Sequence, residues 1–317
     1  MSIDTFRVGL ILTERCNITC AHCWLSSGPE RHKSMRLSDA LRYVDEAAEL
    51  PQMEWISITG GEPFLLYDEM LTIIRHASEL GLKTECVTNC YWAVNRGEAE
   101  DRLRELMEAG LDVIDISVDD FHQRFIPFER VRNCYEAAKR LGLKVVIQSV
   151  YGRGSRLRLD EIIRRLGDGG IRVLGPRPRG KPLYAIAIES GFIPIGRGAM
   201  IPREEWPLGS GPVEGPCQVV LRDISISPDG RLLPCCSALG LLPQASMGTL
   251  TERRLSELLG EALEAELLRW LREVGPLGIA ERIGFNLNPE GYVNRCHLCY
   301  EVLRNAYDFH RRAKRGF

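Results

Sequence analysis

Strand-prone apolar runs alternate with helical segments through the first two thirds of the chain, and this alternation limits the folds open to it. The predicted strands span residues 6–12, 55–59, 83–88, 113–118, 144–150 and 184–188. The predicted helices span residues 38–50, 68–80, 97–109, 128–141 and 160–166. Strands and helices that alternate in this way form βα units around a parallel sheet. The sequence therefore predicts an α/β fold.

Three cysteines, Cys16, Cys20 and Cys23, follow the first predicted strand with the spacing C-x3-C-x2-C. The strand delivers them to its carboxyl end, where open α/β sheets and barrels place their ligand sites. Three thiolates can hold three irons of a 4Fe-4S cluster and leave the fourth iron open to a ligand that is not protein. Because similar cysteine spacings also occur in zinc sites, a zinc or purely structural site is the alternative.

The length of 317 residues predicts about two domains, and the formal net charge of −2 gives no reason to expect nucleic acid or a membrane as a partner. No apolar run approaches the roughly 18 residues needed to span a bilayer, and no signal-peptide pattern precedes Cys16. We therefore expect a cytoplasmic protein. In that reducing compartment, the eleven cysteines favour thiolate–metal chemistry over disulfides.

The stretch from Leu10 to Cys23 resembles the signature of the radical S-adenosylmethionine (SAM) superfamily. The resemblance implies a partial (β/α)6 barrel, open on one side, which the six predicted strands suit. It implies that Cys16, Cys20 and Cys23 hold a 4Fe-4S cluster whose open iron binds SAM. It also implies that His22, directly before the third cysteine, packs near the adenine.

Gly60-Gly61-Glu62-Pro63 directly follows the second predicted strand and resembles the family's GGEP motif, which holds the methionyl amino group of SAM. Two glycines let a backbone approach a ligand closely, and an adjacent carboxylate can accept hydrogen bonds from an ammonium. We therefore expect these four residues to bind the cofactor. The alternative is a simple turn between a strand and a helix.

Ser117 and Asp119 lie at the end of the fourth predicted strand, at alternate positions that point to the same face. This arrangement resembles the family's ribose motif, and it implies that both side chains reach SAM from the barrel interior. The alternative is that Asp119 caps the turn into Phe121-His122.

Two further residues have open roles. Gln148 is polar in an otherwise apolar strand, and it contacts either SAM or substrate, or else a neighbouring strand. Where the family usually has Thr-Asn-Gly after the third strand, this chain has Thr88-Asn89-Cys90. We expect Cys90 to be a small buried residue rather than a tuned active-site group.

Proline and glycine become dense between residues 175 and 215, so we expect a barrel domain in 1–200 and a second domain in 201–317. A β-hairpin predicted within 219–233 brings Cys217 and Cys235 together. After a helical run over 253–272, Cys296 and Cys299 form a C-x2-C pair at the start of a last helix.

These four cysteines resemble the ligands of the "twitch" domain, the short form of the auxiliary-cluster domain called SPASM, and the segment 194–199 resembles the one that closes the last barrel strand in such members. The resemblance implies one auxiliary 4Fe-4S cluster on Cys217, Cys235, Cys296 and Cys299. Cys236 is a rival ligand, but side chains at consecutive positions diverge, so only one of the pair can ligate. A zinc ribbon, with His297 available to it, is the structural alternative.

The resemblance as a whole implies an enzyme that cleaves SAM reductively and uses the 5'-deoxyadenosyl radical to abstract hydrogen from an unactivated C–H bond. A low-potential electron donor such as ferredoxin or flavodoxin would be a partner. We expect a ribosomally made peptide as substrate, matured by oxidative cross-linking or ring formation. Its leader would be recognised by a separate leader-peptide-binding protein, by the second domain or by the basic stretch 177–181.

Two alternatives to peptide maturation remain open. One is a dehydrogenase or cyclase of a small metabolite, as in the family's enzymes that oxidise aminoglycosides. The other is a non-enzymatic iron-sulfur or zinc protein, for which the Gly60-Gly61-Glu62-Pro63 motif and a six-stranded barrel would have no use. The residues identify no catalytic acid or base.

Overall fold

The computed structural model describes residues 4–174 and 184–313, without the side chains of residue 244 and residues 306–313. The basic stretch at 177–181 therefore lies outside the described residues.

One curved sheet forms the centre of the molecule, with its strands in the order β6-β7-β5-β4-β3-β2-β1-β8-β9. The strands are β1 (Arg7–Thr13), β2 (Trp55–Gly60), β3 (Lys83–Thr88), β4 (Val113–Ser117), β5 (Lys144–Tyr151), β6 (Arg172–Val173), β7 (Ala185–Gly191), β8 (Asp223–Ile226) and β9 (Leu232–Leu233). All neighbours are parallel except β8 and β9. Within the described residues β6 and β9 are open edges, so the sheet is a partial barrel. The six predicted strands are present as β1 to β5 and β7, which confirms the α/β fold class.

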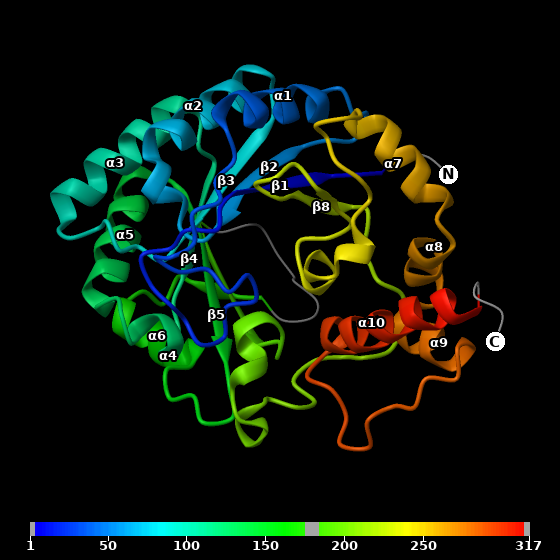
Figure 1. The fold of residues 1–317 in the computed structure, drawn as a ribbon. Helices are drawn as coiled ribbons and strands as arrows, with labels where there is room; N and C mark the ends of the chain where they lie inside the picture. The colour runs from blue at the N-terminus through cyan, green and yellow to red at the C-terminus, as the bar shows by residue number, and fades with distance from the viewer. Residues whose placement is uncertain (1–3, 175–183, 314–317) are drawn as a thin grey trace.

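Five helices cover the outer face of this sheet (Figure 1). They are α1 (Leu37–Ala48), α2 (Tyr67–Glu79), α3 (Arg96–Ala109), α5 (Phe128–Leu141) and α6 (Leu159–Leu166). Each begins and ends within two residues of the predicted bounds. Short helices occupy several connections: η1 (Pro63–Leu66), α4 (Asp120–Gln123), η2 (Gly196–Met200), η3 (Arg203–Glu205), η4 (Ala238–Leu241) and η5 (Pro243–Ala245). No helix in the described part of the chain is long and apolar enough to cross a membrane.

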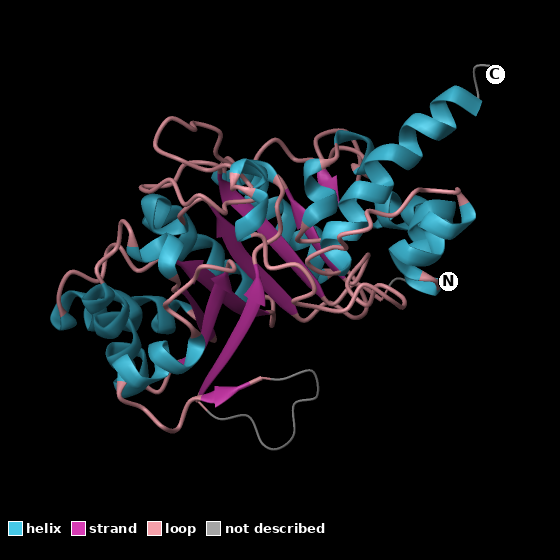
Figure 2. Ribbon diagram, turned by 90° about the horizontal axis from the view of Figure 1, so that it is seen from below, coloured by secondary structure: helices cyan, strands magenta, loops and turns pink. Residues whose placement is uncertain are grey.

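The chain after residue 200 returns to the sheet. Strand β8 lies beside β1, with Arg7 opposite Asp223 and Leu10 opposite Ile226, and β9 folds back on β8. The sequence predicts this hairpin but not its place in the barrel sheet. Figure 2 shows the resulting continuous sheet between layers of helix and loop.

The last helices form a group beside the hairpin (Figure 1). They are α7 (Leu255–Glu264), α8 (Glu266–Glu273), α9 (Gly275–Arg282) and α10 (Arg295–Ala313). The helix predicted over 253–272 is interrupted at Ala265, whose extended backbone (φ −67°, ψ 115°) separates α7 from α8. Helix α9 is not predicted from the sequence, whereas the last helix begins directly before Cys296, as predicted.

Two buried apolar clusters stabilise the fold. The larger cluster joins the sheet to its helices, and it includes Ile224 and Ile226 of β8 and Leu255, Leu258 and Leu259 of α7. The smaller cluster lies between α7, α8, α9 and α10. Because residues beyond 200 contribute to the barrel core, the division into 1–200 and 201–317 stays a prediction.

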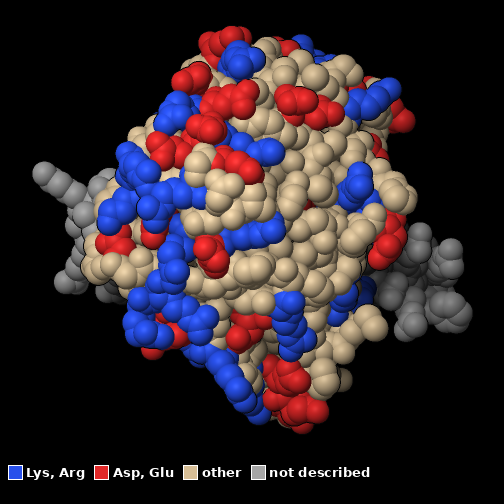
Figure 3. Space-filling model, turned by 90° about the vertical axis from the view of Figure 1, so that its left-hand side faces the viewer, with Lys and Arg blue, Asp and Glu red and all other residues tan. Residues whose placement is uncertain are grey.

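The face formed by α3, α5 and α6 carries basic and acidic side chains next to one another (Figure 3). Glu100 pairs with Arg104 and Arg140, each at 2.8 Å. Exposed pairs of this kind contribute only about 0–1 kcal/mol each. The stability of the fold therefore depends mainly on the buried clusters.

We expect a fragment that ends at residue 200 not to fold stably. It lacks β8 and α7, so it exposes the edge of β1 and loses the burial of Ile224, Ile226 and Leu255. Each such side chain contributes about 1.5–3 kcal/mol, against a net stability of about 5–15 kcal/mol for a typical domain. Thermal unfolding followed by circular dichroism, with the full chain as control, would measure this. Cooperative unfolding of the fragment near the melting temperature of the full chain would contradict it.

Candidate active site

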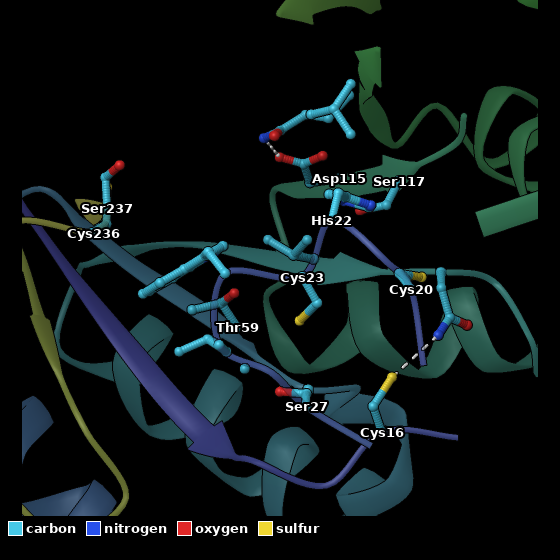
Figure 4. A pocket seen from close by; sticks show the side chains of 18 of the residues that line it. Cys16, Cys20, His22, Cys23, Ser27, Thr59, Asp115, Ser117, Cys236 and Ser237 are labelled. Carbon is cyan, nitrogen blue, oxygen red and sulfur yellow. Dashed lines mark hydrogen bonds between the residues drawn. The ribbon is translucent and has the colours of Figure 1, made fainter. Parts of the chain in front are cut away.

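A cavity of about 400 Å³ runs through the inside of the curved sheet. Side chains from β1 to β5, β7 and β8 line it, together with the loop that follows β1 (Figure 4). The predicted site residues in its wall are Cys16, Cys20, His22, Cys23, Gly60, Gly61, Glu62, Ser117, Asp119 and Gln148. Pro63 is not among the lining residues, because it is buried at the start of η1. The fold thus brings ten of the eleven residues predicted for the first cluster and SAM to one space.

The cysteine loop, residues 14–28, is closed by hydrogen bonds of its own backbone. The Cys16 N–H donates to Gly28 O at 3.2 Å, and the Cys23 N–H donates to Cys20 O at 3.1 Å. Cys16 and Cys20 are buried, and Cys23 is half-buried. Figure 4 shows the three cysteines around one end of the cavity.

Arg197, on η2, ties the cysteine loop to the far side of the barrel. Its Nε donates to Cys20 O at 2.8 Å, its Nη2 to Ser27 O at 2.5 Å, and its backbone N–H to Cys23 O at 3.1 Å. Gly196 lets η2 approach this closely, because a Cβ there would lie 2.1 Å from Trp24 O. The segment that was expected to close the last barrel strand therefore also fixes the cysteine loop.

The thiols of this loop need a bound cation to ionise. Burial raises the pKa of Cys16 to about 12, so a thiolate there needs a bound cation. Thiolates about 2.3 Å from one zinc ion lie within about 4 Å of each other. Among the described residues, one group of three or more His, Cys, Asp or Glu side chains has its ligand atoms within 4.8 Å of one another. It consists of His22, Asp119 and His122 and contains no cysteine. The three thiols do not form such a preformed group for one ion, and the cluster that they would hold stays a prediction.

Gly60 and Gly61 are packed against the backbone that leads into the cysteine loop. A Cβ on Gly60 would lie 2.4 Å from Thr13 O, and one on Gly61 would lie 2.0 Å from Arg15 O. The Gly61 N–H donates to Thr13 O at 2.7 Å. Contact between two chain segments is thus one reason for glycine here, and the approach to a ligand inferred from the sequence stays a prediction.

Glu62 is fully buried, and its carboxylate joins two loops. Oε1 accepts hydrogen bonds from Phe64 N (3.2 Å) and Thr88 Oγ1 (2.8 Å), and Oε2 accepts one from Asn89 N (2.8 Å). Burial raises the pKa of Glu62 to about 7, although these hydrogen bonds act in the opposite direction. Glu62 therefore holds the loop after β3 in place, and its contact with the SAM ammonium stays a prediction.

Asp119 is buried at the N-terminus of α4 and caps it, as the alternative interpretation expected. Oδ1 accepts from Phe121 N (2.9 Å) and His122 N (3.0 Å), and Oδ2 lies 2.9 Å from His122 Nδ1. Burial alone would raise the pKa of Asp119, but the charge and hydrogen bond of His122 lower it to about 2. Because Asp119 also lines the cavity, its ribose contact stays a prediction.

His22 lies between Phe121 and His122, with ring centroids 4.7 Å and 5.1 Å away. Burial lowers the pKa of His22 to about 4, so the ring is neutral near pH 7. Its Nδ1 is buried and has no hydrogen-bond partner among the described residues. His22 thus presents a neutral ring to the cavity, which suits the expected adenine contact.

Asn89 and Cys90 follow β3 and differ in exposure to the cavity. Asn89 lines it, and its Nδ2 lies 3.8 Å from Cys16 Sγ and 2.9 Å from Asn17 Oδ1. Hydrogen bonds to ligand sulfurs tune iron-sulfur clusters. Cys90 adopts φ 64°, the left-handed conformation that favours glycine, and it is buried in the larger apolar cluster. This confirms the expectation that Cys90 is a small buried residue.

Ser117 and Gln148 face the cavity from the neighbouring strands β4 and β5, where they lie opposite each other. Gln148 Nε2 donates to Asp115 Oδ2, so Gln148 contacts a neighbouring strand here. The hydroxyl of Ser117 keeps its expected place on the same face as Asp119.

The C-terminal cysteines gather in and around the smaller apolar cluster. Cys235 and Cys299 are buried in it, and Cys217 packs against it. Burial raises the pKa of Cys299, and the nearby Cys235, Cys296 and Cys217 raise it further. The fold therefore brings the four predicted ligands together, while the cluster itself stays a prediction.

Cys236 and His297 are near the four predicted ligands, but their side chains make other contacts. Cys236 lines the barrel cavity, whereas Cys235 points into the apolar cluster, so the two side chains diverge as predicted. His297 packs between Trp206 and Tyr292, and its Nδ1 accepts a hydrogen bond from Val293 N at 3.2 Å. These contacts favour a structural histidine over a zinc ligand.

Four residues of the site were not assigned from the sequence: Asn89, Asp115, His122 and Arg197. Asn89 belongs to the Thr88-Asn89 part of a family motif, and Asp115 lies at the same alternate positions as Ser117 and Asp119. The sequence therefore contains a signal for both residues. His122 and Arg197 are placed by contacts between distant segments, which a single sequence does not reveal.

The first half of the chain is similar to known proteins. Residues 10–166, about half of the chain, match the model of the radical SAM superfamily. The chain is 25% identical to the putative peptide biosynthesis protein YydG of Bacillus subtilis over 133 residues. This aligned stretch covers 42% of each protein. The chain spans less than half the length of this and similar curated relatives.

Two solved structures share the fold over most of the chain. SuiB of Streptococcus suis, bound to its precursor peptide SuiA, aligns with a TM-score of 0.58 at 14% identity, over 92% of this chain and 75% of SuiB. BtrN, in complex with AdoMet and 2-DOIA, aligns with a TM-score of 0.54 at 16% identity, over 88% of this chain and 91% of BtrN.

The raised pKa of Glu62 predicts a pH-dependent stability. A folded pKa of about 7 against an ordinary 4.5 means that the folded state binds this proton more tightly than the unfolded state. The Glu62 contribution to the free energy of unfolding should therefore fall by about 3 kcal/mol between pH 4.5 and 7, and stay constant above pH 7. Urea unfolding of wild type and Glu62→Gln at pH 5 and pH 8 would measure it.

The comparison needs a matched control. Glu79→Gln, at an exposed position of α2, should give the same pH dependence as wild type. An identical stability difference between wild type and Glu62→Gln at both pH values would show that Glu62 is not titrating in this range.

Proposed function

Because the chain belongs to the radical SAM superfamily, we propose that it is an enzyme that binds a 4Fe-4S cluster and SAM in the barrel cavity and modifies a peptide. The observation that carries this proposal is that the cysteine loop, residues 60–62 and the Ser117–Asp119 strand end all line one cavity. Cys16, Cys20 and Cys23 would hold the cluster. Together, the bound cluster and SAM supply a 5'-deoxyadenosyl radical that takes hydrogen from an unactivated C–H bond.

The residues of this chain position the loops around the cavity and enclose it. Arg197 and the Gly60-Gly61 contact fix the cysteine loop at one end of the cavity, and Glu62 fixes the loop that carries Asn89. Asp119 and His122 form a buried ion pair beside Cys20 that keeps α4 in place at the cavity wall. Enclosure by the sheet and these loops excludes water, which protects a reactive intermediate.

A peptide is the substrate class that the comparisons favour. YydG is named a putative peptide biosynthesis protein, and SuiB has been solved with its precursor peptide. A small metabolite is the second candidate, since BtrN, of similar length, was solved with 2-DOIA. Under the first candidate, a separate leader-binding protein and a ferredoxin or flavodoxin would be partners. A precursor-peptide gene beside this one would favour the first candidate, and a sugar-pathway gene the second.

We propose that the segment after residue 200 is a twitch-type domain with an auxiliary 4Fe-4S cluster on Cys217, Cys235, Cys296 and Cys299. Their common location around the smaller apolar cluster supports it. With four protein ligands, this cluster would have no open iron, so its role would be electron transfer rather than substrate binding.

The central test is SAM cleavage. The anaerobically reconstituted protein should release 5'-deoxyadenosine from SAM when reduced with dithionite, measured by liquid chromatography. Replacing Cys16, Cys20 and Cys23 together by Ala should abolish release, because three irons lose their ligands. Cys90→Ala, outside the cavity, is the matched control and should retain activity if it folds. Release of 5'-deoxyadenosine by the triple variant would overturn the assignment.

The auxiliary cluster has its own test. Wild type should hold about eight irons, and Cys299→Ala about four, while still cleaving SAM. Cys236→Ala should keep about eight, because Cys236 faces the barrel cavity rather than the apolar cluster. Iron and zinc analysis of the three proteins would measure this. About four irons with stoichiometric zinc in wild type would contradict the auxiliary cluster.

A further inference from the structure

The barrel interior contains a hollow where a filled core would be expected. In closed eight-stranded barrels, branched apolar side chains fill the interior. Here Gly9, Ser57 and Ser225 lie next to one another in register on β1, β2 and β8, and all three line the cavity. The Ser225 hydroxyl packs closely over Gly9, since a Cβ there would lie 3.0 Å from Ser225 Oγ. Because none of the three side chains is larger than that of serine, they leave room on the inner face of the sheet.

Charged side chains surround this hollow. Arg7 Nη1 donates to Glu85 Oε1 at 3.0 Å, which neutralises that pair. Asp115 is 4% exposed and lines the same cavity. Its Oδ2 accepts a hydrogen bond from Gln148, whereas its Oδ1 accepts none among the described residues. A buried carboxyl oxygen without a donor indicates a place for a ligand's donor group.

Asp115 is the carboxyl of this hollow that lacks a paired cation among the described residues. Asp223 lies two residues before Ser225 on the same face of β8, and its Oδ1 also has no partner among the described residues. Of the carboxyls that line the hollow, Glu85 is paired with Arg7, whereas Asp115 has no ion pair among the described residues. Burial raises the pKa of Asp115, and Glu85 raises it further. A cation placed beside Asp115 would restore its ionised form.

We propose that this part of the cavity, the floor formed by Arg7, Gly9, Ser57, Glu85, Asp115 and Ser225, binds the ammonium group of a substrate side chain. The proposal rests on the proposed function and names the substrate's chemistry at this subsite. An anionic group is disfavoured by the carboxyls, and an apolar group would leave Asp115 Oδ1, Arg7 Nε and Ser225 Oγ unpaired among the described residues.

The position of the floor agrees with this role. Asp115 lies two residues before Ser117 on β4, so it is about 7 Å deeper in the barrel than the predicted ribose contact. A lysine-like side chain that reaches Asp115 with its ammonium would leave its carbon atoms between the floor and SAM. Anchoring at the floor would therefore present C–H bonds to the radical.

Binding of three capped amino acids tests the proposal: the N-acetyl N-methylamides of lysine, norleucine and glutamate. They share a backbone and differ in the end of the side chain. Ligand-observed NMR titrations with the anaerobically reconstituted enzyme should show lysine binding at least tenfold tighter than the other two. Asp115→Asn should lose that preference, and Asp101→Asn, an exposed carboxylate on α3, should keep it.

Two further measurements keep the outcome decisive. Ser57→Val fills the hollow without touching Asp115, so it should also reduce lysine binding about tenfold, and it serves if Asp115→Asn does not fold. Each preparation is assayed for SAM cleavage. Cleavage of SAM with equal binding of lysine and norleucine overturns the floor assignment and leaves the proposed function intact. Selective lysine binding without SAM cleavage overturns the proposed function and leaves the floor assignment intact.

Discussion

Close backbone contact between residues 13–15 and Gly60-Gly61 is the constraint on which the rest of the site depends. No side chain fits between these segments, since a Cβ on either glycine would lie within 2.4 Å of a carbonyl oxygen. The contact sets the start of the cysteine loop and the place of Glu62 together. Glu62 then holds Asn89, and Asn89 reaches back to Cys16. A closed chain of contacts therefore positions the first cysteine from two strands at once.

Burial governs the electrostatics of the cavity, but its effect depends on the neighbour. Cys16, Glu62 and Asp115 all have raised pKa values, with desolvation as the largest cause. Asp119 is equally buried, yet its pKa is lowered, because His122 lies within hydrogen-bond distance. The cavity therefore favours the neutral form of an acid where no cation lies nearby. An acid stays ionised there only where the chain places a cation beside it.

The strands and helices up to residue 166 could be predicted closely, because their apolar periods and glycine ends are local signals. The cysteines, residues 60–62 and Ser117 could also be placed at one cavity, since parallel strands end at the same edge. The reason for the glycines could not be found, because it depends on a neighbouring segment's backbone. The break at Ala265 and the pairing of β8 with β1 were missed for the same reason: neither leaves a local pattern.

The pairing of β8 with β1 also has a consequence for the order of synthesis. Arg7 meets Asp223 across 216 positions, and Arg197 meets Cys20 across 177. At about 5–20 residues per second, a ribosome needs about 10–40 s to make the chain between these partners. During this interval the edge of β1 and the cysteine loop lack the segments that secure them, so three thiols stay accessible on a nascent chain. Because these closing contacts are non-local, the cysteine loop reaches its final form only late in folding.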